Sequence, residues 1–356
     1  MTLLVNLSFA PSQPTGWLNY SLNLLPQLQN IDTHLISPFE IPEMKCYPSP
    51  ANITTDFGIK GHFRRLFWLQ WQLPQLYLRM QSQLLFSPIP EAPLFSGCRY
   101  VITIHDLIPL RLKKIFSTAQ KVYCRYYIPA VINSAQHIIC NSQTTAEDLY
   151  NFLEVPEHKI TVIPLAYDHK NFRLLNLPKQ NYFLYLGRHN PHKNITRLIA
   201  AFAALPNYQD YEIWFVGATD KRYTPILQKQ IQELGLTQQA KFLNYIHYKD
   251  LPQIINQALA LVFPSLWEGF GFPVLEAMAC GTPVITSNVS SLPEVAGDAA
   301  ILIDPYKISA ITEAMKVILA NTQLRNSLSL AGISRASQFS WEKTGKATME
   351  VLQSHL

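Results

Sequence analysis

The sequence of 356 residues lacks the features that mark several protein classes. Charged residues make up only 15%, which is too few for a disordered chain or a coiled coil. No uninterrupted apolar run reaches the roughly 20 residues that a membrane-spanning helix needs. The apolar N-terminus carries no basic segment ahead of its apolar residues, so it is more typical of a buried first strand than of a signal peptide.

Cysteines and metal-binding motifs are also sparse. The five cysteines are scattered and form no Cys-x-x-Cys pair, which argues against a disulfide framework or zinc site and favours the reducing cytoplasm. No Asp-x-Asp motif indicates a metal, and no Gly-x-Gly-x-x-Gly follows the first strand, which argues against a Rossmann dehydrogenase. The net charge of +5 suits an anionic small molecule or membrane surface and gives little support for a nucleic-acid partner.

Short apolar runs alternate with helical patterns from end to end of the chain. This alternation predicts parallel sheets covered by helices on both faces. The runs are too many for one ordinary sheet, so two Rossmann-like domains are favoured over a (β/α)8 barrel. The expected strands are residues 3–7, 34–37, 84–87, 100–104, 137–140, 160–163, 182–186, 212–216, 241–243, 259–263, 283–286 and 300–303. The expected helices are 17–28, 118–133, 144–153, 196–204, 224–234, 252–258, 273–280 and 308–319.

The domain boundary is expected in the aperiodic stretch 165–180. We therefore predict a first domain at residues 1–170 and a second at residues 171–338. Residues 339–356 are predicted to form a C-terminal helix able to pack back on the first domain.

The most informative segment follows the expected strand that ends at Phe263. Its loop carries Glu268 and two glycines, Pro273 stands where a helix would begin, and Gly281 is suited to a left-handed helix cap. Ligands of doubly wound folds bind at the carboxyl ends of strands, and the free N–H groups of a helix start attract anions. Glu276, one turn into the helix, then supplies a second carboxylate.

Two carboxylates beside an anion site are suited to accept hydrogen bonds from sugar hydroxyls. Taken singly, Glu276 could merely complement the helix dipole, and Glu268 could be an ordinary loop residue. A hydrolase would need one carboxylate on each side of the scissile bond and would give no reason for the basic residues Arg188 and Lys193.

The segment WEGFGFPVLEAMACGTPVI resembles the signature of glycosyltransferase family 4, the Glu-x7-Glu motif of retaining GT-B enzymes. The resemblance implies the GT-B fold, an α/β architecture of two Rossmann-like domains facing across a cleft. It also implies that the first domain binds the acceptor and the second binds the nucleotide-sugar. It assigns Glu268 to the transferred sugar as a catalytic residue and Glu276 to the ribose hydroxyls. It also implies that backbone groups of Gly269, Phe270 and Gly271 line the sugar pocket.

A basic loop follows the strand that is expected to end near Leu186. It carries Arg188, Lys193 and Asn194, the last a candidate helix N-cap. By themselves the two cations could be solvated loop residues. The resemblance extends to their spacing and implies that they hold the donor diphosphate and stabilise the departing nucleotide.

Three further candidates lie in the first half of the chain. His105 and Asp106 end a strand in a pattern that resembles mannosyltransferase-like members of the family. That resemblance assigns His105 to the donor sugar in the catalytic centre and Asp106 to its support, although a capped loop histidine would look the same. Gly16 is the one glycine left in a loop that is richer in glycine across the family, and it is assigned to the diphosphate.

Other segments allow two interpretations. Ser142 and Glu294 match family positions, but each is equally suited to helix capping. The basic, aromatic segment 60–79 is consistent with a helix lying on a membrane or with a core helix. A second basic cluster, formed by Arg111, Lys113 and Lys114, would face the acceptor.

The expected activity is transfer of a hexose, with mannose favoured, from a nucleoside diphosphate to a hydroxyl of a glycan or lipid-linked sugar, with retention of configuration. GDP-mannose is the favoured donor; UDP- or ADP-glucose and deoxysugar donors stay open. No cofactor or metal is expected. The alternatives are a nucleotide-sugar epimerase or hydrolase of the same fold and a non-catalytic nucleotide-sugar-binding subunit. The protein is expected in the cytoplasm, either free or at the inner membrane surface.

Overall fold

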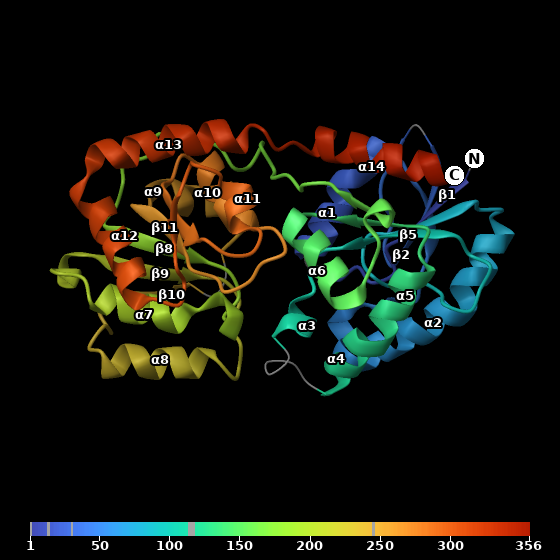
Figure 1. Ribbon diagram of the computed structural model, residues 1–356, viewed down its shortest axis with the longest axis horizontal. Helices are drawn as coiled ribbons and strands as arrows, with labels where there is room; N and C mark the ends of the chain where they lie inside the picture. Colours follow the sequence, from blue (N-terminus) through green and yellow to red (C-terminus); the bar gives the residue numbers. More distant parts are fainter. Residues whose placement is uncertain (1, 13–14, 30, 113–117, 244–245) are drawn as a thin grey trace. The chain divides into compact units, whose positions relative to one another are not determined.

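The computed structural model describes residues 2–12, 15–29, 31–112, 118–243 and 246–356, which form two compact units (Figure 1). The first unit comprises Met1–Leu165 and Trp341–Leu356, and the second comprises Ala166–Ser340. The divisions therefore follow Leu165 and Ser340, whereas the sequence suggested residues 170 and 338.

The first unit is built on a parallel sheet of seven strands in the order β3-β2-β1-β4-β5-β6-β7. Six of the strands were expected from their apolar runs, which parallel strands need because helices cover both faces. The strands are Thr2–Asn6 (β1), Asp32–Ser37 (β2), Lys45–Pro48 (β3), Leu84–Ser87 (β4), Tyr100–Ile104 (β5), His137–Cys140 (β6) and Ile160–Val162 (β7).

Strand β3 was missed because its four residues, KCYP, form no apolar run. It pairs only with β2 and lies at the edge of the sheet, with three of its four residues exposed. An edge strand tolerates both the charged Lys45 and the terminal Pro48, which a central strand would exclude.

The helices of the first unit pack around this sheet. The 3₁₀ segments are Leu25–Leu28 (η1), Ala51–Ile53 (η2), Thr55–Phe57 (η3) and Glu157–Lys159 (η5). The α-helices are Gly16–Leu24 (α1), Gly58–Arg79 (α2), Ile108–Arg111 (α3), Thr118–Val122 (α4), Ile128–Ser134 (α5), Gln143–Leu153 (α6) and Trp341–His355 (α14).

The helix expected over residues 118–133 is interrupted by a π-helical turn, Tyr123–Tyr127 (η4), between α4 and α5. Pro129 at the start of α5 explains the interruption. Proline has no N–H to bond the carbonyl four residues earlier, so a regular α-helix cannot run through this position.

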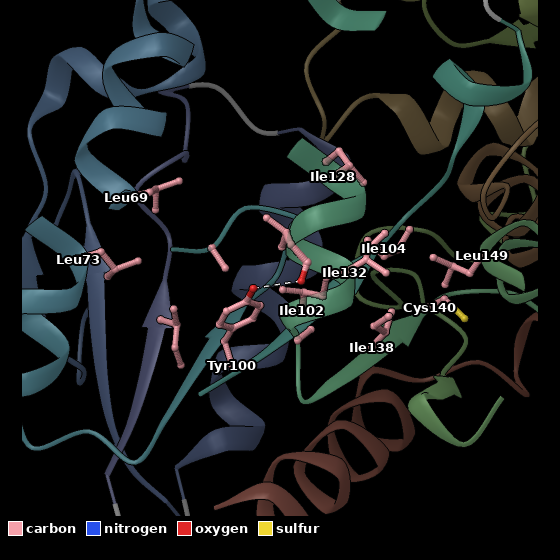
Figure 2. Packing of buried hydrophobic residues seen from close by; sticks show 14 of the residues in the cluster. Leu69, Leu73, Tyr100, Ile102, Ile104, Ile128, Ile132, Ile138, Cys140 and Leu149 are labelled. Atoms are coloured by element: carbon pink, nitrogen blue, oxygen red, sulfur yellow. Dashed lines mark hydrogen bonds between the residues drawn. The ribbon is translucent and has the colours of Figure 1, made fainter. Parts of the chain in front are cut away.

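A hydrophobic core joins the sheet of the first unit to its helices (Figure 2). Figure 2 shows Leu69 and Leu73 of α2 and Ile132 of α5 among this cluster, beside residues of β5 and β6. The Tyr100 hydroxyl donates a hydrogen bond to the Val131 carbonyl at 3.1 Å, which satisfies the polar atom inside this apolar region.

Helix α14 belongs to the first unit although it lies at the far end of the chain. It contacts α1, η1 and β4, and the Trp341 ring lies 6.3 Å from that of Tyr20. Gly345 permits the close approach, because a Cβ there would lie 2.2 Å from the Gln27 side chain.

The second unit contains a parallel sheet of six strands in the order β10-β9-β8-β11-β12-β13. All six strands were expected from the sequence. They are Tyr182–Leu186 (β8), Glu212–Val216 (β9), Ala240–Leu243 (β10), Ala260–Phe263 (β11), Val284–Ser287 (β12) and Ile301–Ile303 (β13).

Helices cover both faces of the second sheet. Figure 1 shows α7 and α8 on one side of β8 and β11, with α9 and α10 on the other. The α-helices are Ile195–Ala203 (α7), Thr224–Glu233 (α8), Leu251–Gln257 (α9), Phe272–Ala279 (α10), Leu292–Ala296 (α11), Ile308–Ala320 (α12) and Thr322–Ala336 (α13). The 3₁₀ segments are Pro191–Lys193 (η6) and Tyr208–Asp210 (η7).

The order in which the chain adds strands to the second sheet reverses between β8 and β11. Chain order runs outward from β8 to β9 and β10 on one side, and from β11 to β12 and β13 on the other. In open α/β sheets, ligands bind at such a switch point, beyond the carboxyl ends of the strands. The loops that follow β8 and β11 are therefore the expected place for a site.

Candidate active site

Two loops at this switch point are joined by an ion pair. Lys193, in the loop after β8, places its Nζ 2.6 Å from Oε1 of Glu268, in the loop after β11. Both side chains are largely buried, and the Lys193 ammonium also lies 5.2 Å from the centre of the Phe263 ring. The structure thus brings together two of the residues that the sequence singled out.

Backbone hydrogen bonds fix the same two loops to each other. The carbonyl of His192 accepts from the Leu266 N–H at 2.7 Å and from the Ser265 hydroxyl at 3.1 Å. Burial lowers the pKa of His192 to about 4, against the opposing effect of Glu268, so this histidine is neutral at physiological pH. The charge of Glu268 is thus balanced by Lys193 and not by its histidine neighbour.

The loop after β12 positions the backbone of Glu268. The N–H of Glu268 donates to the Ser290 hydroxyl at 3.2 Å, and the Ser291 hydroxyl is placed to donate to the carbonyls of Glu268 (3.0 Å) and Phe270 (2.7 Å). Ser290 has a positive φ of 59°. These serines could not be assigned a role from the sequence, because hydroxyl side chains are common in loops.

Asn194 precedes α7, as expected, but its side chain does not cap that helix. Its amide nitrogen donates to the carbonyls of Pro264 (3.0 Å) and Pro305 (2.7 Å), and its φ is 62°. The prediction that Asn194 occupies the N-cap position is confirmed, but its side chain makes no capping hydrogen bond. Asn194 instead ties the loop after β8 to the start of the Glu268 loop.

Arg188 is exposed, and no hydrogen bond or ion pair links its guanidinium to the described residues. It follows Gly187, whose φ of 149° accompanies a close approach of two backbone segments. A Cβ on Gly217 would lie 2.2 Å from the Gly187 carbonyl oxygen. Gly217 was not singled out in the sequence. Because it has no Cβ, the chain after β9 can pack closely against the chain after β8, next to Arg188.

Helix α10 begins as the sequence indicated. Gly271 is its N-cap with a φ of 127°, a proline occupies its first turn, and Gly281 ends it with a φ of 68°. The Phe270 side chain is buried and its ring lies against those of Phe272 and Phe339, so only its backbone is available to a ligand. Gly269 is also buried, between Glu268 and Phe270.

Glu276 lies on α10 without an ion pair or hydrogen bond from its carboxylate to the described residues. Burial, and next the nearby charge of Asp168, raise its pKa to about 8. Tyr248 belongs to the same cluster, because its hydroxyl approaches Asp168 at 3.5 Å. Asp168 and Tyr248 were missed in the sequence, since 80 residues separate them and neither belongs to a motif.

The raised pKa of Glu276 predicts a pH effect on stability. A carboxyl whose pKa is higher in the folded protein favours folding below its unfolded value near 4.5, and this contribution is lost as the pH rises through about 8. Glu276→Gln removes the titration. The melting temperature of the nucleotide-free variant should therefore rise relative to the wild type as pH increases across this window. A constant difference from pH 5 to pH 8 would contradict the prediction.

His105 belongs to the first unit, where it is buried against the rings of Trp17 and Tyr20. Its Nε2 lies 2.8 Å from the Pro88 carbonyl, which can only accept, so Nε2 carries the proton. Burial lowers its pKa to about 4, which leaves the ring neutral and makes Nδ1 an acceptor. His105 lines a largely apolar cavity of about 110 Å³ that also touches Trp17, Asp106 and Tyr123.

Asp106 accepts a hydrogen bond from the Ile108 N–H at 3.1 Å and so shapes the turn after β5. Gly16 is the first residue of α1, behind the N-cap Thr15. Ser142 caps α6, which confirms the capping interpretation, and Glu294 lies in the first turn of α11.

The second basic cluster, formed by Arg111, Lys113 and Lys114, lies only partly within the described residues. Arg111 forms an ion pair with Asp148, whereas Lys113 and Lys114 lie outside the described residues. Across the described parts of the chain, no group of three or more His, Cys, Asp or Glu side chains could hold a metal ion.

Comparisons with known proteins identify the family to which the chain belongs. Residues 168–335 match the family model for glycosyl transferases group 1, and residues 26–171 match that for glycosyltransferase family 4. O-antigen chain mannosyltransferase B of Escherichia coli is 30% identical over 263 residues, which cover 70% of this chain and 69% of the relative. O-antigen chain mannosyltransferase RfbU of Salmonella typhimurium is 29% identical over 328 residues, 89% of this chain and 90% of the relative.

Solved structures show the same fold at lower sequence identity. Sucrose-phosphate synthase from Thermosynechococcus elongatus superposes with a TM-score of 0.81 at 20% identity, over 99% of this chain and 98% of that one. Anabaena HepE in complex with UDP and glucose gives 0.78 at 19% identity, over 99% and 100%. The two α/β units, each built on a sheet of parallel strands, thus have the GT-B architecture expected from the sequence. The chain belongs to glycosyltransferase family 4, and it is a hexosyltransferase.

Proposed function

We propose that this enzyme transfers mannose from a nucleoside diphosphate to a hydroxyl of a glycan or lipid-linked sugar, with retention of configuration. The observation that carries the proposal is the buried Lys193–Glu268 pair at the switch point of the second sheet. It places a carboxylate and an ammonium on adjacent loops. One of these loops also carries Arg188, whose guanidinium has no partner among the described residues.

The cations of this site fit a diphosphate. Arg188 has a free guanidinium fork that can bind phosphate oxygens through two N–H groups, and Lys193 adds a point charge. The negative charge that develops on the leaving nucleotide would be stabilised by both groups and by the N-terminus of α10. These groups carry the charge without a metal, and no cofactor is proposed.

The sugar is assigned to the loop after β11. Glu268 is proposed to accept from a sugar hydroxyl while Lys193 holds its carboxylate in place, and backbone groups of Gly269, Phe270 and Gly271 complete the pocket. In the first unit, His105 is assigned to the donor sugar through its Nδ1 acceptor, with Asp106 holding the turn. Gly16, at the start of α1, is assigned to the diphosphate.

Glu276 is proposed to bind the ribose hydroxyls of the nucleotide. Its carboxylate has no hydrogen-bond or ion-pair partner among the described residues, and two neighbouring hydroxyls would supply donors. Ribose binding would also lower the cost of ionising this group near Asp168. The proposal explains why a carboxylate without a cation is placed so close to a second acidic group.

Mannose is favoured because the two O-antigen relatives are mannosyltransferases. The His105–Asp106 context supports the same sugar and leads us to favour GDP as the nucleotide. A glycan or lipid-linked acceptor is proposed from the O-antigen names of these relatives. A cytoplasmic location is proposed because all five cysteines are free thiols.

Thermal-shift measurements with GDP, UDP, ADP and dTDP test the nucleotide. GDP at a hundred times its dissociation constant should stabilise the protein by about 2.7 kcal/mol, and the other nucleotides should do less at equal concentration. Stabilisation by UDP alone would overturn the preference for GDP-mannose, and no stabilisation by any of the four would overturn the donor site.

Two variants distinguish the proposed contacts to the ribose from those to the diphosphate. Glu276→Ala should reduce the shift caused by GDP and by guanosine alike, whereas Arg188→Ala should reduce only that caused by GDP. The matched controls Glu342→Ala and Arg99→Ala change exposed residues of the first unit and should behave as the wild type. A Glu276→Ala protein that binds GDP as tightly as the wild type would refute the ribose assignment.

A further inference from the structure

Helix α2 exposes a row of large apolar side chains along one side. Phe63, Phe67 and Trp71 follow one another at intervals of four residues, which places them on one face. Together with Ile59 and Leu78 they are between 60% and 72% exposed. Soluble monomers rarely expose so much contiguous apolar surface unless it contacts something.

The opposite face of α2 is already part of the core. Trp68, Leu69 and Leu73 are buried there, so the expectation of a packed helix is confirmed. Arg65 fixes the helix further, because its guanidinium binds the Glu91 carboxylate at 2.5 and 2.8 Å. The exposed row therefore lies on a rigid support.

Two neighbouring elements extend this surface. Gln70 of α2 donates to the Ala92 carbonyl at 3.2 Å and accepts from the Leu94 N–H at 2.8 Å, which holds the adjoining Phe95 beside the helix. Phe95 is 97% exposed. On another side, the Tyr123 ring of η4 lies 4.7 Å from that of His62, and Tyr126, one turn away, is exposed.

The charged residues of this region are mostly basic. Between residues 57 and 146 the chain has ten Lys and Arg but two Asp and Glu, whereas the remainder has 19 and 22. One of the two acids, Glu91, is buried against Arg65. Lys60, Arg64 and Arg125 are exposed, so the positive charge faces outward around the apolar row.

We propose that this surface, formed by α2, the Phe95 loop and η4, docks on an anionic lipid bilayer. Aromatic side chains flanked by cations suit the interface between acyl chains and phosphate headgroups. A second copy of the chain is a poorer occupant, because the facing surface would bring the same cations and no exposed carboxylate between 57 and 90 to pair with them. No helix of the described residues is long and apolar enough to cross a bilayer.

This inference uses residues outside the nucleotide site and does not depend on the donor or acceptor. Flotation with vesicles provides the test. The wild type should bind vesicles of phosphatidylcholine and phosphatidylglycerol in equal amounts at least about tenfold better than vesicles of phosphatidylcholine alone. Raising the salt concentration should weaken the binding.

Paired variants identify the surface. Phe67→Ser/Trp71→Ser should lower binding by about tenfold or more through lost apolar burial, and Lys60→Gln/Arg64→Gln should lower it by a similar factor through lost charge. Ile226→Ser/Leu330→Ser removes two exposed apolar side chains of the second unit and should leave binding unchanged. Melting curves establish that each variant is folded.

Two results would overturn the proposal. One is equal recovery of the wild type with both kinds of vesicle, or equal binding by Phe67→Ser/Trp71→Ser and wild type. The other is a wild-type dimer in sedimentation that Phe67→Ser/Trp71→Ser converts to a monomer, which would assign the surface to a second copy of the chain.

Discussion

Glu268→Ala should lower kcat by about 100- to 1,000-fold, because the hydrogen bond proposed from a sugar hydroxyl to this carboxylate is lost in the transition state. The carboxylate is held by Lys193 at 2.6 Å and by backbone bonds to two serines, so its position is set before the donor binds. Its removal also leaves the ammonium of Lys193 largely buried without its partner. The rate is measured as release of nucleoside diphosphate, with a bacterial lipid extract as acceptor source.

The ion pair should behave as a unit in this measurement. Lys193→Met should be impaired, and Lys193→Met combined with Glu268→Ala should lose little more than the worse single variant. The exposed Glu342→Ala serves as the control for loss of one carboxylate. A Glu268→Ala enzyme with wild-type kcat would remove Glu268 from the catalytic centre.

Glu91→Gln should destabilise the first unit by about 3–5 kcal/mol, because it leaves the Arg65 guanidinium buried without a counter-charge. Burial opposes ionisation of Glu91, but the charge and hydrogen bonds of Arg65 outweigh it and lower the pKa of the carboxyl. Arg65 also donates to the Ile53 carbonyl at 2.9 Å, so the pair links α2, η2 and the segment after β4. Urea unfolding followed by tryptophan fluorescence measures the loss.

An exposed pair provides the comparison. The Nζ of Lys45 lies 2.7 Å from Oδ1 of Asp32, but these two side chains are 67% and 46% exposed. Asp32→Asn should therefore cost about 0–1 kcal/mol. Arg65→Met combined with Glu91→Leu, which replaces the buried charges by apolar groups, should recover most of the stability lost in Glu91→Gln. Equal losses from Glu91→Gln and Asp32→Asn would show that burial of the Arg65 pair has no special cost.

The sequence predicted those parts of the fold that depend on local pattern. Strands such as Tyr100–Ile104 are buried on both sides and therefore form continuous apolar runs. Strand β3 escaped detection because an edge strand needs no such run, and the π-helical turn before Pro129 was hidden inside a helical pattern. Pairing with β2 decides the first case, whereas the local effect of Pro129 decides the second.

Some residues of the candidate site could be predicted from local sequence, whereas their contacts with one another could not. Glu268, Glu276, Arg188 and Lys193 could be selected because they stand beside glycines at the ends of predicted strands. Nothing in the sequence indicated that Lys193 would pair with Glu268, 75 residues away. Likewise, the approach of Tyr248 to Asp168 and the support from Ser291 follow from the order of strands in the sheet, which local spacing does not specify.

The return of α14 to the first unit sets an order of events during synthesis. Residues 166–340 form an uninterrupted unit and leave the ribosome before Trp341–Leu356. The second unit can therefore complete its sheet while the first still lacks the helix that covers Tyr20 and η1. Until α14 emerges, that apolar surface is open to solvent, and a nascent chain stalled within residues 166–340 would be the form most in need of a chaperone.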